Sequence, residues 1–221
     1  MTDPAAAIRI EARWPVVLAI LSVIALLTAM PGRIRIFPVW FPFLLGTLVI
    51  VPTAAVGFVP GKPLWLRIER LFIRLFFVVT LVGSIVSQAN LITAMISRSS
   101  EISGVQLLTS SIAVWVTNVL AFSLLYWQMD RGGPEARTSG TRVKPDWLFP
   151  QDGASPEDFP RDWCPAFLDY LSLGFNTSTA FSPTDVLPLT RRAKMLMMLE
   201  SAISLVTIVV VASRAINILG S

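Results

Sequence analysis

Residues 163–185 read WCPAFLDYLSLGFNTSTAFSPTD, an apolar segment that runs into a cluster of hydroxyl-bearing residues. Asp162 and Pro165 are typical of a helix start, and the helix should fade near Asn176. That leaves about 12 helical residues, roughly 18 Å, against a hydrocarbon core of about 30 Å. Lipid does not tolerate the unpaired backbone that must follow so short a helix. We therefore predict a re-entrant pore helix and loop, sheltered by other copies of the chain around a symmetry axis.

Outward from this stretch, the sequence returns to apolar runs of helical length. Residues 193–219 form the last predicted crossing, and residues 105–127 form a helix that ends in Tyr126 and Trp127, an aromatic pair typical of a membrane interface. Between these helices, residues 130–162 are rich in glycine, proline and acidic residues. This composition predicts one sizeable extramembrane loop.

Three more apolar runs precede this part of the chain, at residues 14–30, 40–58 and 64–96. The third would be roughly 49 Å long, too long for one perpendicular crossing. It is predicted to divide into an interfacial helix, residues 64–74, and a crossing helix, residues 72–96. Arg67, Arg70 and Arg74 fall on one face of the interfacial part. The predicted organisation is three crossings in residues 1–104 and a channel-like pore module in residues 105–221.

The composition also indicates a membrane protein. Of the 221 residues, 54% are hydrophobic and 14% are charged, and the mean hydropathy is +0.67. We predict an all-α integral membrane protein with about five transmembrane helices plus the re-entrant helix and loop, in a bacterial inner (plasma) membrane. The formal charge of +4 and the pI near 9.8 do not indicate nucleic-acid binding. Lys and Arg stand singly at the ends of apolar runs, where they meet lipid headgroups.

Residue types that common catalytic and metal sites need are missing. The sequence has no histidine, which excludes imidazole bases and histidine metal ligands. The single cysteine, Cys164, has no partners for a zinc site and is predicted to be a small buried residue. No nucleophile and base pair is visible, so we predict that the chain is not an enzyme and that it holds no cofactor or metal.

Several residues before and after the hydroxyl cluster, and at the start of the last helix, follow a known order: Thr177, Thr179, Asp185, Pro188, Thr190, Leu199, Glu200, Ser201, Ala202 and Ser204. With them, residues 170–219 resemble the pore module of the potassium-channel superfamily, in which an outer helix, pore helix, filter loop and inner helix repeat around a fourfold axis. The whole chain also resembles bacterial integral-membrane families of unknown function that end in such a degenerate pore motif. The resemblance implies a homotetramer with a central ion pathway.

The filter positions depart from that family. Potassium channels carry Thr-Val-Gly-Tyr-Gly there, and its carbonyl rings replace the hydration shell of the ion. At the aligned positions this chain has Ala180, Phe181, Ser182, Pro183 and Thr184. Both glycines are lost and proline restricts its own φ, so the backbone of the family's filter is not accessible at low cost. We therefore predict a weakly selective channel without a potassium filter.

Two interpretations of the hydroxyl residues stay open. With a ring of Asp185 carboxylates, the hydroxyls of Thr177, Thr179, Ser182 and Thr184 would line a wide, hydrated mouth that prefers monovalent cations. Alternatively, these side chains cap helix ends and close the lumen. The chain would then be a non-conducting membrane assembly or scaffold protein with a channel-like fold.

Three polar residues are predicted to support the pore loop: Asp169, Asn176 and Glu200. Glu200 lies about two turns into the last helix, where an ionisable side chain usually has a partner, so we expect it to brace the loop from behind. Asn118, inside the preceding long helix, is predicted to form a hydrogen bond between helices.

The charge distribution conflicts with the orientation of the channel family. Five crossings and a loop that enters from outside would place the N-terminus outside. The usual bias of basic residues toward the inside favours the reverse, because residues 9–13 and 62–74 contain more of them than residues 33–35, 98 and 214. The conflict would disappear if residues 163–181 crossed completely, giving six helices, or if residues 67–74 were held inside the protein.

Overall fold

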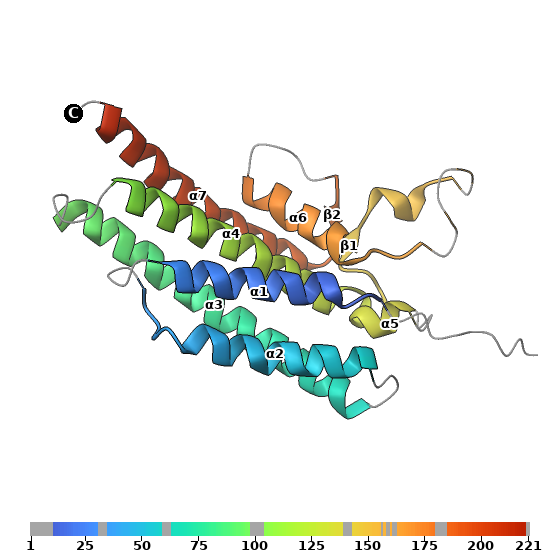
Figure 1. The fold of residues 1–221 in the computed structure, drawn as a ribbon. Coiled ribbons are helices and arrows are strands. Elements are labelled where there is room, and N and C mark those ends of the chain that lie inside the picture. Colours follow the sequence, from blue (N-terminus) through green and yellow to red (C-terminus); the bar gives the residue numbers. More distant parts are fainter. Residues whose placement is uncertain are drawn as a thin grey trace, which may run out of the picture.

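Five helices run alongside one another and form the body of the molecule, as the computed structural model shows (Figure 1). They are α1 (Trp14–Ala29), α2 (Phe41–Phe58), α3 (Pro63–Ser97), α4 (Gly104–Met129) and α7 (Arg191–Leu219). The structure describes residues 11–30, 35–58, 63–97, 104–138, 143–155, 157, 160, 163–179 and 185–219. Within these residues, α2, α3, α4 and α7 contain segments that are long and apolar enough to cross a membrane. The sixteen residues of α1 are apolar but span only roughly 24 Å. The prediction of an all-α membrane protein is therefore confirmed at this level.

Helix α4 occupies the centre of the bundle, where it packs against α1, α3, α6 and α7. Its aromatic residues Phe122, Tyr126 and Trp127 are fully buried. Around them lie Val16, Ile20 and Val23 of α1, Ile73, Phe76 and Phe77 of α3, and Ile203 of α7. Because α4 has apolar residues on all sides, its burial is favourable only where other helices surround it, which is the centre of the bundle.

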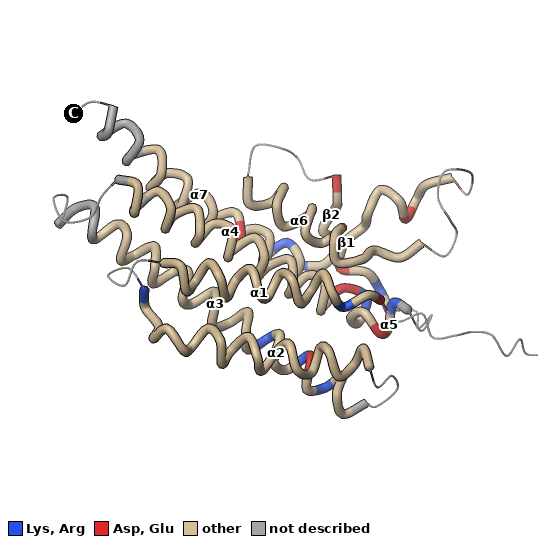
Figure 2. The backbone as a smooth tube through the Cα atoms, viewed as in Figure 1, with Lys and Arg blue, Asp and Glu red and all other residues tan. Residues whose placement is uncertain are grey.

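The short elements lie together at one end of the bundle. They are η1 (Asp130–Gly132), α5 (Pro134–Thr138), β1 (Trp147–Leu148), η2 (Pro150–Gly153) and β2 (Leu187–Pro188). β1 and β2 pair antiparallel, with Trp147 opposite Pro188 and Leu148 opposite Leu187. We call this end of the bundle the polar end. Figure 2 shows that most positions with charged residues lie there and along the neighbouring parts of α3 and α7.

Helix α6 (Phe167–Thr179) is the short helix predicted within residues 163–185. It starts later than predicted, because the Asp169 carboxylate accepts a hydrogen bond from the Ala166 amide (2.8 Å) and so fixes the first turn there. It also extends past Asn176, since Thr177 and Ser178 are buried against α4 and α7. The chain enters α6 from the polar end and is back at that end in β2 (Figure 1).

Residues 63–97 form one continuous helix, α3, without the predicted break, because its inward face from Leu66 to Leu91 packs on the bundle throughout. The interfacial position of residues 64–74 stays a prediction. The prediction for Cys164 was wrong. Cys164, predicted to be buried, is exposed beside α5, because it precedes α6 and its neighbour Pro165 is the residue that is buried there.

Candidate functional site

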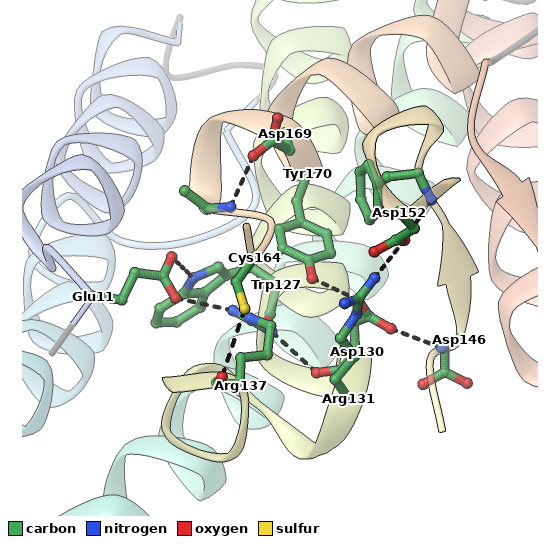
Figure 3. Close-up of polar contacts among 12 residues, drawn as sticks. Glu11, Trp127, Asp130, Arg131, Arg137, Asp146, Asp152, Cys164, Asp169 and Tyr170 are labelled. Atoms are coloured by element: carbon green, nitrogen blue, oxygen red, sulfur yellow. Dashed lines mark hydrogen bonds and ion pairs between the residues drawn. The ribbon is translucent and has the colours of Figure 1, made fainter. Parts of the chain in front are cut away.

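A group of polar side chains joins seven segments at the polar end (Figure 3). We call it the polar-end network; it consists of Glu11, Trp127, Asp130, Arg131, Arg137, Asp146, Asp152, Tyr170 and Arg192. These residues come from the approach to α1, the end of α4, η1 and α5, the loop with β1, and the first turns of α6 and α7.

A tight turn after α4 makes the network possible. Arg131, Gly132 and Gly133 all have positive φ, at 53°, 80° and 99°. Glycine accepts this conformation without steric cost, and a Cβ on Gly133 would lie 3.1 Å from the Gln128 carbonyl oxygen. The turn directs α5 back over the end of α4, so that Arg137 faces the carbonyl groups that α4 leaves unpaired.

Arg137 and Glu11 form the part of the network nearest α1. The Arg137 guanidinium donates hydrogen bonds to the carbonyl oxygens of Trp127 (2.8 Å) and Asp130 (3.0 Å) and pairs with the Glu11 carboxylate (3.1 Å). Glu11 also accepts hydrogen bonds from the Trp127 indole (2.6 Å) and the Phe167 amide (3.1 Å). One carboxylate therefore links the ends of α4 and α5 to the start of α6.

Asp130 forms the centre of the network and is completely buried. Its carboxylate accepts hydrogen bonds from the Tyr170 hydroxyl (2.6 Å) and the Asp146 amide (2.7 Å), and Arg131 lies at 3.5 Å. Burial raises the pKa of the Tyr170 phenol well above its ordinary value; the guanidinium of Arg137 opposes that rise and the Asp130 carboxylate adds to it. Tyr170 is thus a neutral donor that holds α6 on the end of α4.

Asp146 connects the two short strands to α7. Its buried carboxylate receives two hydrogen bonds from Arg192, at 2.7 and 2.6 Å, and one from the Thr190 hydroxyl at 2.5 Å. The Asp146 carbonyl accepts from the Leu189 amide (2.8 Å). This two-pronged contact between a guanidinium and a carboxylate fixes the first turn of α7 as well as the register of the strands.

A second polar contact lies deeper, between α4, α6 and α7. Glu200 is completely buried, and its carboxyl oxygens accept hydrogen bonds from Tyr126 (2.5 Å) and Ser178 (2.8 Å). Ser201, one residue on, donates to the Thr177 carbonyl at the end of α6 (3.1 Å). No ion pair joins Glu200 to Lys or Arg within the described ranges. The last turn of α6 is therefore attached to α7 through Glu200 and Ser201.

Other buried polar residues of α7 also point into the subunit. Asn118 of α4 donates to the Ser204 hydroxyl (2.9 Å) and the Glu200 carbonyl (3.3 Å), which confirms its predicted role between helices. Gln88 of α3 donates to the Thr207 hydroxyl (2.7 Å) and the Ile203 carbonyl (3.0 Å). The exposed side of α7 in this region is apolar, with Met195, Met198, Leu205, Val206 and Val209.

The structure separates the predicted pore residues into three groups. Ala180, Phe181, Ser182, Pro183 and Thr184 lie outside the described residues. Thr177 is buried inside the subunit, Thr179 is half-buried with its hydroxyl on the Asn176 carbonyl (3.0 Å), and Asp185 is exposed. Of the predicted supports, only Glu200 contacts the end of α6. Asp169 caps the opposite end of that helix, and Asn176 is half-buried with its amide 3.4 Å from the Ser172 hydroxyl.

The residues of the polar-end network were not predicted as a group. Partners in the network are as far apart as Glu11 and Phe167, 156 positions, so no local spacing connects them. The available signal was the sequence 130–137, in which a charged pair and two glycines directly follow the aromatic end of α4. Within the described residues no group of three His, Cys, Asp or Glu side chains is arranged to hold a metal ion.

The close approach of α6 to α4 depends on Gly174. A Cβ at this position would lie 2.4 Å from the Ser123 hydroxyl, 3.2 Å from the Val119 carbonyl and 3.3 Å from Glu200 Oε1. We expect Gly174→Ala to lower the free energy of unfolding by about 1–3 kcal/mol, because the helices must separate. Thermal unfolding in detergent, followed by circular dichroism, measures this. Gly153→Ala is the matched control, since a Cβ there has nothing within 4 Å; equal effects would contradict the prediction.

Comparison of the chain with family models, with curated proteins and with solved structures gives no match. The resemblance to the potassium-channel pore module stays a prediction from the sequence.

Proposed function

We propose that this integral membrane protein carries a channel-like pore module, made of α4 as outer helix, α6 as pore helix and α7 as inner helix, which assembles as a homotetramer and passes monovalent cations with weak selectivity. The observation that carries the proposal is the course of α6. Its 13 residues span roughly 20 Å, less than a bilayer core, and the chain is back at the polar end by β2. Such a segment is stable in a membrane when protein or a water-filled cavity surrounds it.

The contacts at both ends of α6 support this proposal. Glu11 and Tyr170 attach its first turns to the polar-end network, and Ser178 attaches its last turn to Glu200. A helix fixed at both ends keeps a constant position relative to α4 and α7. Rigid support of this kind is what an ion pathway requires.

Ion flux tests the proposal. Purified protein in liposomes should pass monovalent cations, and Asp185→Asn should reduce that flux, because it removes one carboxylate per subunit from the proposed mouth. Glu157→Gln, which neutralises an exposed acid in the extramembrane loop, is the matched control. Cation flux in dye-loaded vesicles is the measurement; no flux above empty vesicles, or equal flux in both variants, would falsify it.

A second candidate is a non-conducting assembly protein with the same architecture. The observation that favours it is the direction of the hydroxyl and acidic residues, since Thr177, Ser178 and Glu200 face the inside of one subunit. The large exposed side chains of α7 between Met195 and Val209 are apolar. This candidate predicts an intact oligomer in liposomes with a closed axis and no flux.

We further propose that the polar end faces the cytoplasm. Apart from Arg35 and Arg214, the described Lys and Arg residues lie at or toward that end, which the bias of basic residues places inside the cell. Arg67 and Arg74 are exposed, so they are not held inside the protein. Burial of residues 67–74 therefore does not remove the conflict between the charge distribution and the orientation of the channel family. In this orientation α6 enters from the cytoplasmic side, opposite to the channel family.

The single cysteine provides a test of orientation. Because Cys164 is exposed at the polar end, a membrane-impermeant maleimide should label it in permeabilised cells but not in intact cells. In a Cys164→Ser background, Val39→Cys places a thiol on an exposed residue at the opposite end, where intact cells should be labelled. The reverse pattern would show that the polar end faces outside.

A further inference from the structure

The beginning of α3 presents arginine and leucine side chains together on one exposed face. Arg67 and Arg74 are exposed, and so are Leu64 (63%), Leu71 (64%) and Leu75 (44%). The opposite face contains the buried residues of the same turns: Leu66, Glu69, Ile73, Phe76 and Phe77. We call the exposed side the arginine face of α3.

The length of α3 places this face at the edge of the bilayer. The helix has 35 residues, roughly 52 Å, which exceeds a hydrocarbon core of about 30 Å. Residues 75–97, roughly 34 Å, are sufficient to cross it and have exposed Val78, Val82 and Ile85 on their outer side. Residues 63–74 then lie in the headgroup layer. Helix side chains lean toward the N-terminus, so the Arg74 guanidinium extends toward the polar end and away from the core.

The charges on the arginine face are not neutralised by the protein. No ion pair or hydrogen bond of the side chains of Arg67 or Arg74 occurs in the described part of the chain. Arg70, at the edge of the face, donates to the Leu66 carbonyl oxygen (3.4 Å) and has a half-exposed contact with the Glu135 carboxylate at 3.9 Å. The one acid in these turns, Glu69, points inward to Arg13 (3.6 Å). The face therefore has a net positive charge at the depth of lipid phosphates.

We propose that the arginine face of α3 binds an anionic phospholipid. Arg67 and Arg74 hold the negatively charged headgroup through its phosphate, which a guanidinium binds with two parallel hydrogen bonds, and the acyl chains lie along Leu71 and Leu75. The site depends on the position of α3 in the membrane and not on conduction by the pore module.

Native mass spectrometry of the protein in detergent measures the binding. Titration with phosphatidylglycerol should give a bound-lipid species. Phosphatidylcholine, whose headgroup is zwitterionic, should give that species only at a much higher concentration. The Arg67→Gln/Arg74→Gln variant should need roughly 25-fold more phosphatidylglycerol, about five-fold for each arginine removed. Inorganic phosphate should not compete, because the site also uses the acyl chains.

A matched variant distinguishes a site from general surface charge. Arg191→Gln/Lys194→Gln removes the same charge from exposed positions on α7 near the same end. It should retain the affinity of the unmodified protein, and Arg67→Lys/Arg74→Lys should retain part of it. Equal losses in the two Gln variants, equal binding of the two lipids, or full competition by inorganic phosphate would each overturn the proposal. A circular-dichroism spectrum of each variant verifies that it is folded.

Discussion

Asp130→Ala is expected to lower the free energy of unfolding by about 3–5 kcal/mol, the range observed when one partner of a buried charged cluster is removed. The carboxylate is completely buried and accepts hydrogen bonds from the Tyr170 hydroxyl and the Asp146 amide. Without it, both donors remain buried with no acceptor in its place, and Arg131 loses a neighbouring charge. Thermal unfolding in detergent, followed by tryptophan fluorescence, measures the change.

Graded variants identify the cause of this loss. Asp130→Asn keeps the shape and one acceptor, and Tyr170→Phe removes a single hydrogen bond to a charged group, about 1.5–3 kcal/mol. If the two residues act through their shared hydrogen bond, the double variant should lose less stability than the sum of the single ones. Glu157→Ala, at an exposed acid of the same loop, is the control. An Asp130→Ala protein as stable as this control would show that the network does not stabilise the fold.

Glu200→Ala is expected to lower the free energy of unfolding by about 2–4 kcal/mol. The reasons are a cavity between α4, α6 and α7 and the loss of two interhelical hydrogen bonds, from Tyr126 and Ser178. Since α6 is attached to α7 mainly at this point, we also expect its last turn to become accessible to amide hydrogen exchange. Exchange of residues 173–179 measured by mass spectrometry tests this second effect.

The isosteric variant Glu200→Gln distinguishes a neutral from a charged Glu200 carboxyl group. A charged carboxylate in this position would have no cation to balance it among the described contacts, and burying an unpaired charge in a membrane protein is costly. We therefore expect a neutral carboxyl and a Glu200→Gln protein that unfolds within about 1 kcal/mol of the unmodified one, since an amide offers a matching donor and acceptor. A loss as large as that of Glu200→Ala would mean that the carboxylate is charged in the folded protein.

Local sequence patterns predicted the helices well wherever an apolar run extends over the whole helix. The apolar runs of α2, α4 and α7 were located within two residues at each described end, because their length and hydropathy are properties of consecutive residues. The short helix in residues 163–185 was also predicted, from the half-length apolar run alone. Its exact start was not, since this depends on the contact of Asp169 with the Ala166 amide.

Long-range partners could not be predicted from the same patterns. The continuity of α3 depends on its contacts with α2 and α4 and on the pairing of Glu69 with Arg13, the residue before α1. Likewise, whether Thr177 and Ser178 face a shared axis or their own subunit depends on the rotation of α6 about its axis. Gly174 determines that rotation, because only a residue without a side chain fits against Ser123 and Val119.

By itself, the sequence determined that this is a helical membrane protein and where its helices lie, because a segment of about 20 apolar residues in lipid has no stable alternative to a helix. Only the tertiary structure determined how the polar residues are paired. Asp130 with Tyr170, Glu11 with Arg137 and Glu200 with Tyr126 meet because separate helix ends converge in space. A buried polar group must find a partner wherever the fold places one, and that position is a property of the assembled bundle.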